Sequence, residues 1–480
     1  MCLMNYYELP NSTYLTVGSS ILLGFNQFEG SIPIRPNVTL LSLRNILLSG
    51  SIPWNIGQEM LQLEDLYLSD NFLTGSIPPS IKEMRNLSTL DISSNKLSGE
   101  LFEQWMGLEK LWFLDLSYNH LSGGISISIC SQLPSLSWLK LGGNNLSGRF
   151  PSSFPNCTSL VALDLRENGF SGTIPNWVNA EDMASLNYLR LRSNRLHGEI
   201  PEQLCYLPSL HVLDLAYNNL SGPIPKCLGN GSVRMKSPGY LFHFMSLTRH
   251  LPSSADLEFI VKGRLTEYSK IVSLVNLIDL SCNNLSGEIP EELSNLSRLG
   301  SLNLSYNNLM GKIPEIIGKM QLLESLDLSW NHLSGPIPPS MTSMTALNYL
   351  NLSHNNLSGQ IPSSNQFQTL NDQWIYDCNP GLCGPPLPTK CSFPSSDDPS
   401  NRDQSADEDD DHETLWFYAS IALGYIVGFW AVCGTLLMNK SLRHAYFKSA
   451  YACKKSSWSS LQFVWLVSAK KAEDVSRLTE

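Results

Sequence analysis

Aromatic and cationic side chains gather in the middle of the chain, at positions that suggest binding rather than catalysis. They occur in consecutive copies of a short leucine motif, beside or between its leucines. Tryptophan, tyrosine and arginine dominate the binding energy of protein interfaces, so we expect a ligand-binding patch here. The alternative is ordinary variation on a solvated face. The patch consists of Trp112, Phe113, Trp138, Lys140, Arg166, Tyr188, Arg190 and Arg192.

Catalytic chemistry is not indicated elsewhere in the sequence. There is no Gly-rich phosphate loop, no kinase or hydrolase signature, and no paired cysteines at zinc spacing. The aspartates between the motif leucines recur regularly, and we interpret them as surface positions, as we do His211 and His354. We therefore expect no enzyme, cofactor or metal site. A net charge of −11 disfavours nucleic acid as a partner, because phosphate binding needs basic patches.

The elements that position these side chains follow from a repeat, L-x-L-x-x-N-x-L-x-G, which recurs thirteen times, mostly 24 residues apart. Alternate leucines of a short strand fill a core, and the asparagine can bond unpaired backbone groups at the turn. One copy cannot bury its own leucines, so neighbouring copies must stack. The pattern predicts an α/β-type repeat solenoid with a curved parallel sheet. The asparagine position holds Asn26, Ile46, Asn71, Asn95, Asn119, Asn144, Asn168, Asn194, Asn218, Asn283, Asn307, Asn331 and Asn355.

Two blocks of repeats flank a segment that lacks the pattern. Nine repeats, the first irregular, occupy residues 1–230, and four more occupy 271–366. Residues 231–270 form an insertion between them. Most repeats continue after the glycine with x-I-P, and the proline is replaced only at Phe102 and Ser126.

A transmembrane helix is predicted near the C-terminus. Residues 415–438 contain 24 residues without a charge, enough to span a bilayer, and a buried core helix is the alternative. An acidic stalk, 397–414, precedes this segment and a basic tail, 439–480, follows it. The positive-inside rule places the tail in the cytosol and the repeats outside. Within the span, Gly424 and Gly428 form a G-x-x-x-G motif that favours close helix packing.

Together these features resemble the plant leucine-rich-repeat receptor-like proteins, which lack a kinase domain, and in particular defence-type members similar to fungal-elicitor receptors. The resemblance rests on the L-x-G-x-I-P extension, on KGRLTEYSK at 262–270, and on NPGLCGPPLPTKC at 379–391, inside a C-terminal cap of residues 367–396. It implies a superhelix with a parallel β-sheet on the concave face, a second short strand in each repeat, and one transmembrane helix.

The resemblance also implies a function. Such a protein would sit in the plasma membrane and bind an extracellular peptide, protein or glycan. It would signal through an adaptor leucine-rich-repeat receptor kinase and a co-receptor kinase, the latter contacting the insertion and the final repeats. A developmental peptide receptor of the same build and a truncated, non-signalling decoy are the alternatives. The chain begins without a signal peptide or the family's paired-cysteine cap, so we expect an N-terminal truncation.

Cysteines and glycosylation motifs agree with an extracellular location. The resemblance implies a disulfide between Cys383 and Cys391, whereas Cys205 and Cys227 are either bonded or two buried thiols. Cys130, like Cys157, is expected to pack as a small hydrophobic residue. Candidate glycosylation sites are Asn37, Asn86, Asn145, Asn156, Asn219, Asn230, Asn284, Asn295, Asn303, Asn351 and Asn356.

Overall fold

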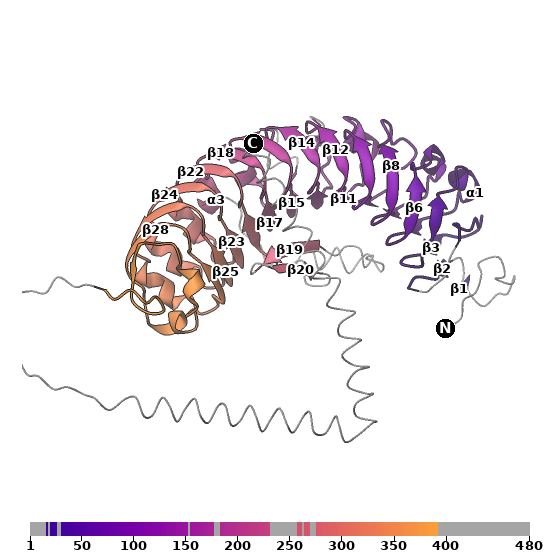
Figure 1. Ribbon diagram of the computed structural model, residues 1–480. Coiled ribbons are helices and arrows are strands. Elements are labelled where there is room, and N and C mark those ends of the chain that lie inside the picture. The colour runs from indigo at the N-terminus through magenta and orange to yellow at the C-terminus, as the bar shows by residue number, and fades with distance from the viewer. Residues whose placement is uncertain are drawn as a thin grey trace, which may run out of the picture. The chain divides into compact units, whose positions relative to one another are not determined.

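The computed structural model divides into two compact units, Met1–Phe393 and Pro394–Glu480. It describes residues 16–17, 20–25, 30–151, 154–176, 183–230, 257–261, 264–268 and 275–391, all in the first unit. This unit is a curved stack of repeats, and the predicted parallel solenoid is confirmed (Figure 1).

A 14-stranded sheet follows the inner side of the arc (Figure 1). Each repeat contributes one three-residue strand, and every neighbouring pair is parallel except the first, which is antiparallel. In spatial order the strands are β1 (Thr16–Val17), β2 (Ser20–Leu22), β3 (Leu40–Ser42), β5 (Asp65–Tyr67), β7 (Thr89–Asp91), β9 (Phe113–Asp115), β11 (Trp138–Lys140), β13 (Ala162–Asp164), β15 (Tyr188–Arg190), β17 (Val212–Asp214), β21 (Leu277–Asp279), β23 (Ser301–Asn303), β25 (Ser325–Asp327) and β27 (Tyr349–Asn351).

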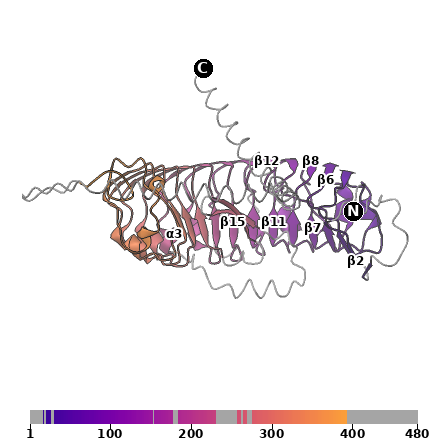
Figure 2. The same cartoon turned by 60° about the horizontal axis from the view of Figure 1, so that its bottom comes forward.

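A second, 13-stranded parallel sheet runs beside the first, as Figure 2 shows for β6, β8 and β12 above β7, β11 and β15. Its strands come from the Asn-x-Leu-x-Gly part of each repeat, which agrees with the second strand that the resemblance implied. They are β4 (Ser49–Ser51), β6 (Phe72–Gly75), β8 (Lys96–Glu100), β10 (His120–Gly123), β12 (Asn145–Gly148), β14 (Gly169–Gly172), β16 (Arg195–Gly198), β18 (Asn219–Gly222), β22 (Asn284–Glu288), β24 (Asn308–Gly311), β26 (His332–Gly335), β28 (Asn356–Gln360) and β29 (Gly381–Cys383).

Short helices complete most repeats. Their start is often set by the x-I-P proline, because its fixed φ suits the residue before a helix; Pro290 and Pro314, for example, are N-caps. The segment 101–112, where Phe102 replaces the proline, contains no helix. The described helices are α1 (Ile56–Glu59), η2 (Pro79–Glu83), α2 (Ile129–Gln132), η3 (Phe154–Asn156), η4 (Glu202–Tyr206), α3 (Cys227–Asn230), η7 (Glu291–Asn295), η8 (Glu315–Lys319), η9 (Pro339–Ser343), η10 (Asn365–Gln368) and η11 (Gln373–Ile375).

The asparagines form the predicted ladder, and Asn307 shows how it works. Its side-chain amide donates to the carbonyls of Leu280, Leu304 and Ser305, at 3.0, 3.2 and 3.2 Å, and its carbonyl oxygen accepts the N–H of Leu285 at 3.0 Å. Each asparagine thus joins its own turn to the repeat before it. The leucines of the motif are buried in one continuous core.

The insertion interrupts the sequence but not the sheets. Strand β17 pairs directly with β21, and β18 pairs with β22. Within the insertion the structure describes one antiparallel hairpin, β19 (Leu257–Val261) and β20 (Arg264–Tyr268).

Three disulfides are present among the residues that the structure describes. Cys383 is bonded to Cys391, and Cys205 is bonded to Cys227, with Cα atoms 5.0 and 5.6 Å apart. A third bond joins Cys130 to Cys157, so the expectation that these two pack as separate small hydrophobic residues is wrong. The reason is that α2 and η3 belong to neighbouring repeats and bring the two Cα atoms within 4.8 Å.

Several predictions fall on residues outside the described ranges. These are the first ladder position, Asn26, the acidic stalk, the span 415–438 with Gly424 and Gly428, and the tail. Among the residues that the structure does describe, none belongs to a helix long and apolar enough to cross a bilayer.

Candidate ligand-binding face

The inner sheet arranges side chains in columns, because its strands pair without a shift in register. In β11 the side chain of Leu139 enters the core, whereas Trp138 and Lys140 lie on the opposite, inner face. Trp138 pairs with Phe113 and Ala162 on either side. From β9 to β17 the columns therefore group residues that are 24 to 26 positions apart in the sequence.

The aromatic members of the predicted patch do meet in one column, but they are not exposed. Phe113 and Trp138 have ring centroids 6.1 Å apart, and Trp138 and Tyr188 approach to 5.9 Å across the small side chain of Ala162. All three rings are at most 2% exposed, while Trp112 beside them is half-buried. The expectation of a solvated aromatic surface is therefore wrong for Phe113, Trp138 and Tyr188.

The cationic members of the patch are buried in ion pairs. The Lys140 ammonium lies 2.7 Å from the Asp115 carboxylate, and the Arg190 guanidinium lies 2.7 Å from that of Asp164. Arg166 also pairs with Asp164, at 3.5 Å. These cations and the aspartates that face them are each at most 8% exposed.

Arg192 joins three consecutive repeats. Its Nε donates to both carboxylate oxygens of Asp214, at 3.1 and 3.0 Å, and its Nη2 donates to Asp279. Asp214 and Asp279 lie on β17 and β21, the two strands that flank the insertion. We call Arg192, Asp214 and Asp279 the arginine clamp.

The aspartates between the motif leucines are thus not the surface positions that the sequence suggested. Asp91, Asp115 and Asp279 are at most 1% exposed, because cations or hydroxyls from adjacent columns cover them. His211 is likewise buried and bonded to Asn276 at 2.8 Å. The expectation of solvent exposure is wrong for these residues, whereas His354 is half-buried.

Burial and pairing have opposite effects on the aspartate pKa values. Burial raises the pKa of Asp279 to about 6, against the opposing effect of the Arg192 guanidinium. Burial also raises the pKa of Asp115, although Lys140 counteracts it. For Asp164 the effect of burial is outweighed by Arg190, Arg166 and Lys140, which hold its pKa below the usual range. The ladder organises charge within the sheet and presents no proton-transfer pair to a substrate.

A different set of aromatic side chains is exposed, and these residues were not predicted as a site from the sequence. Tyr217, Tyr306 and Trp330 are 53%, 48% and 45% exposed, and His354 follows in the same column. The Tyr306 and Trp330 rings stack with centroids 5.1 Å apart, and Trp330 and His354 stack at 3.7 Å. We call these four residues the aromatic column. Their signal in the sequence is that each one directly precedes a ladder asparagine.

Backbone geometry explains why the aromatic column projects outward. Tyr306 and Trp330 have φ values of 54° and 55°, a left-handed conformation that turns the chain from the inner strand into the second sheet. A side chain at this turn is not covered by side chains of the adjacent strands, as a residue within the inner sheet is. A serine directly precedes Tyr306 and Trp330. The hydroxyl of Ser305, for example, donates to the side-chain oxygen of Asn303 at 2.7 Å.

The sequons fall on different surfaces of the solenoid. Asn303 and Asn351 lie on the inner sheet, where each amide oxygen accepts both the N–H and the hydroxyl of its own sequon serine. The side-chain environment of Asn230, at the end of α3, is outside the described part. Exposed sites on the second sheet or near the helices are Asn37, Asn145, Asn156, Asn219, Asn284, Asn295 and Asn356, and Asn86 is half-buried.

No group of three or more metal-ligating side chains that could hold an ion is found within the described ranges. The geometry therefore offers an extended inner face with a buried ionic ladder and an exposed aromatic rim.

Comparison with known proteins agrees with this architecture. The leucine rich repeat models match residues 61–121 and eight segments that follow, 135–157, 159–180, 185–207, 209–230, 275–296, 298–320, 322–344 and 346–368. The chain is 48% identical over 314 residues to receptor-like protein EIX2 of Solanum lycopersicum, and 49% identical over 334 residues to receptor-like protein EIX1 of the same species. These matches cover 64% and 66% of this chain but 30% and 32% of the relatives, so the chain spans about a third of their length.

Solved structures of plant receptors share the fold. The plant peptide hormone receptor RGFR1, in complex with RGF2, is 30% identical with a TM-score of 0.56, covering 72% of this chain and 52% of that one. The structure of PEPR1 with AtPEP1 is 31% identical, also with a TM-score of 0.56, covering 72% and 46%. Repeat pattern, fold and sequence similarity agree, and the chain belongs to the leucine-rich-repeat proteins as a relative of the plant receptor-like proteins.

Proposed function

We propose that this chain is the ligand-sensing subunit of a plant cell-surface receptor, which binds an extracellular ligand through its repeats and signals through a partner receptor kinase in defence. Support comes from the similarity to two tomato receptor-like proteins and from the peptide complexes of RGFR1 and PEPR1. The proposal includes a membrane anchor at 415–438, whose charge asymmetry orients the repeats outward, and helix packing through Gly424 and Gly428.

The observation that carries the proposal is the aromatic column. Large aromatic side chains that remain about half exposed on a well-ordered scaffold are typical of protein interaction sites. Three of its four members, Tyr306, Trp330 and His354, lie in the final repeats, the region that the resemblance associates with a co-receptor kinase. Tyr306, Trp330 and His354 are already stacked, so little of their side-chain entropy remains to be lost on binding.

The predicted patch has a different place in this proposal. Its buried rings and ion pairs hold the inner strands in register, and only Trp112 is half-buried. We propose that the patch sets the shape and potential of the ligand face while exposed side chains make the contacts.

A binding measurement tests the proposal directly. The full chain in detergent micelles is immobilised, and the ectodomain of a plant leucine-rich-repeat co-receptor kinase is passed over it. Replacing Tyr306 and Trp330 with alanine should weaken binding at least tenfold, since interface aromatics contribute about 2 kcal/mol or more each. The matched control is Trp54→Ala, a 76% exposed tryptophan that lies ahead of α1, away from the column. Equal affinity for the native chain and the double variant would refute the role of the column.

The alternative functions predict other outcomes. A decoy binds ligand or co-receptor yet gives no response when it is expressed with the adaptor kinase in leaves. A developmental receptor of the same build responds to an endogenous peptide and not to fungal culture filtrate. A tagged chain that fails to reach the plasma membrane contradicts the proposed location.

A further inference from the structure

A pocket on the flank of the solenoid lies where the repeat pattern is broken. Its volume is about 530 Å³, within the range of about 300 to 1,000 Å³ for ligand sites. It is formed by residues 100–104, which begin with the last residue of β8, and by residues 124–128 and Gln132 of the next repeat. These two segments contain Phe102 and Ser126, the only two positions in thirteen repeats where x-I-P lacks its proline.

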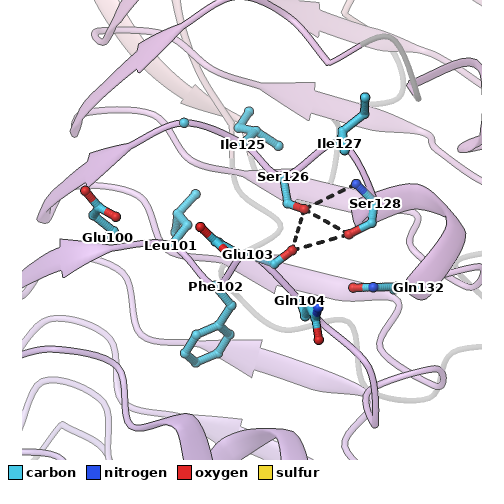
Figure 3. A pocket seen from close by; sticks show the side chains of 11 residues that line it. Glu100, Leu101, Phe102, Glu103, Gln104, Ile125, Ser126, Ile127, Ser128 and Gln132 are labelled. Atoms are coloured by element: carbon cyan, nitrogen blue, oxygen red, sulfur yellow. Dashed lines mark hydrogen bonds between the residues drawn. The ribbon is translucent and has the colours of Figure 1, made fainter.

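Hydrogen bonds hold the wall of this pocket in place. The Ser126 hydroxyl donates to the main-chain carbonyl of Glu103 at 2.6 Å, and the Ser128 hydroxyl donates to the same oxygen at 3.3 Å. The two hydroxyls lie 2.9 Å from each other (Figure 3). Gln132 accepts the backbone N–H of Trp105, the buried residue that anchors the irregular segment. The wall is therefore formed before any ligand arrives.

The chemistry of the lining is acceptor-rich and negative. The carboxylates of Glu100 and Glu103 lie on one side of the serine pair and Gln132 lies on the other (Figure 3). Both glutamates are exposed, and neither has an ion-pair partner among the described residues. No cationic side chain lines the pocket. Lys82 lies outside the lining, with its ammonium 5.4 Å from the centre of the Phe102 ring.

Apolar side chains complete the lining. Leu101 and Ile125 are buried in its floor, and Ile127 is 66% exposed at its edge. An arginine side chain matches this combination, because its methylene stem packs on apolar surface while its planar guanidinium bonds carboxylates with several donors. A sugar would also form hydrogen bonds with hydroxyl and amide groups, but a neutral sugar would not need the two unpaired carboxylates.

We propose that this pocket binds an arginine side chain of a peptide. The site is separate from the inner face and does not rest on the proposed receptor function. The guanidinium is held between Glu100 and Glu103, and the stem lies on the apolar floor.

The test uses the full chain in detergent micelles and the probe acetyl-Ala-Ala-Arg-Ala-Ala-amide, with its citrulline analogue as the neutral, equally shaped control. The arginine peptide should bind at least ten times more tightly than the citrulline peptide. Replacing Glu100 and Glu103 together with glutamine should remove most of this difference. Glu288→Gln is the matched control, since Glu288 ends β22 as Glu100 ends β8, and it should leave binding unchanged.

A second variant tests the pocket wall without changing charge. Ser126→Pro restores the repeat consensus, so the fold should be retained, but it removes the hydroxyl that fixes Glu103 and should weaken binding several-fold. The proposal is overturned if the arginine peptide does not bind, or if the citrulline peptide binds equally well. It is also overturned if Glu288→Gln weakens binding as much as the double glutamine variant, because the attraction would then be a general effect of negative charge.

Discussion

The arginine clamp should be a strong side-chain link between the repeats on either side of the insertion, in addition to the pairing of β17 with β21 and of β18 with β22. Arg192 is 6% exposed, and the two carboxylates that it holds, Asp214 and Asp279, are 2% and 1% exposed. Arg192→Met keeps the apolar stem and removes the charge. It leaves the buried carboxylates of Asp214 and Asp279 without the cation that bonds both of them.

The expected cost follows from that burial. Breaking a buried ion pair by removing one partner destabilises a protein by about 3 to 5 kcal/mol. In a solenoid each repeat contacts only its neighbours, so the loss should stay local rather than spread over all repeats. Since 1.4 kcal/mol is a factor of ten, amide hydrogens of β17 and β21 should exchange roughly 100 to 4,000 times faster. Those of β25, two strands beyond β21, should be unchanged.

Hydrogen exchange measured by mass spectrometry on the native chain and the variant provides the assay. Arg195→Met is the control, because Arg195 begins β16 with an exposed side chain and should give native exchange. Adding Asp214→Asn and Asp279→Asn to Arg192→Met should restore much of the protection, since no buried charge then remains unpaired. The reasoning is refuted if Arg192→Met leaves β17 and β21 protected. It is also refuted if the triple variant exchanges as fast as the single one.

Three further predictions concern acidity, the ladder and glycosylation. Burial raises the pKa of Asp279 to about 6, above about 3.9 in the unfolded chain. The stabilising contribution of the protonated Asp279 is therefore complete below pH ~4 and is lost as the pH rises through 6. Asp279→Asn should reduce the dependence of the melting temperature on pH in that window. Asn307→Ala removes four hydrogen bonds and leaves buried backbone groups unpaired, so denaturant unfolding should show a loss of about 2 to 4 kcal/mol, whereas exposed Asn308→Ala should cost under ~1 kcal/mol. Glycopeptide mass spectrometry of the chain purified from plant cell membranes should find Asn145 modified and Asn303 unmodified, because Asn303 is bonded to its sequon serine on the inner sheet. A glycan on Asn303 would contradict that packing.

The repeat architecture could be predicted from the sequence because its causes are local and periodic. A leucine alternation, an asparagine and a glycine recur at one spacing, and each has a fixed physical role in the turn. Asn307 makes the contacts that its residue type implies. The Cys130–Cys157 bond joins neighbouring repeats, as the Cys205–Cys227 bond does, but the sequence led us to expect separate packing of Cys130 and Cys157.

Burial on the inner face could not be judged from single positions, because it depends on pairs of strands. Lys140 looks like an exposed cation until the repeats are aligned, and then it stands between Asp115 and Asp164. Opposite charges on neighbouring strands stabilise each other and shield each other from water. The alternation of charge along the column indicates that these side chains pair and are buried. It becomes visible only when the repeats are compared with one another.

The same comparison explains why the aromatic column is the better candidate for contact with a partner. A ring on a strand, such as Trp138, is flanked by Phe113 and Ala162 at the short spacing of a parallel sheet, and it loses nearly all of its surface. A ring at the left-handed turn, such as Trp330, stacks on its neighbours with its faces and keeps its edge in solvent. Burying that edge under a partner would gain apolar area at little entropic cost. In this chain the position before each ladder asparagine, rather than the position between the leucines, is therefore where variation can change what is bound without disturbing the sheet.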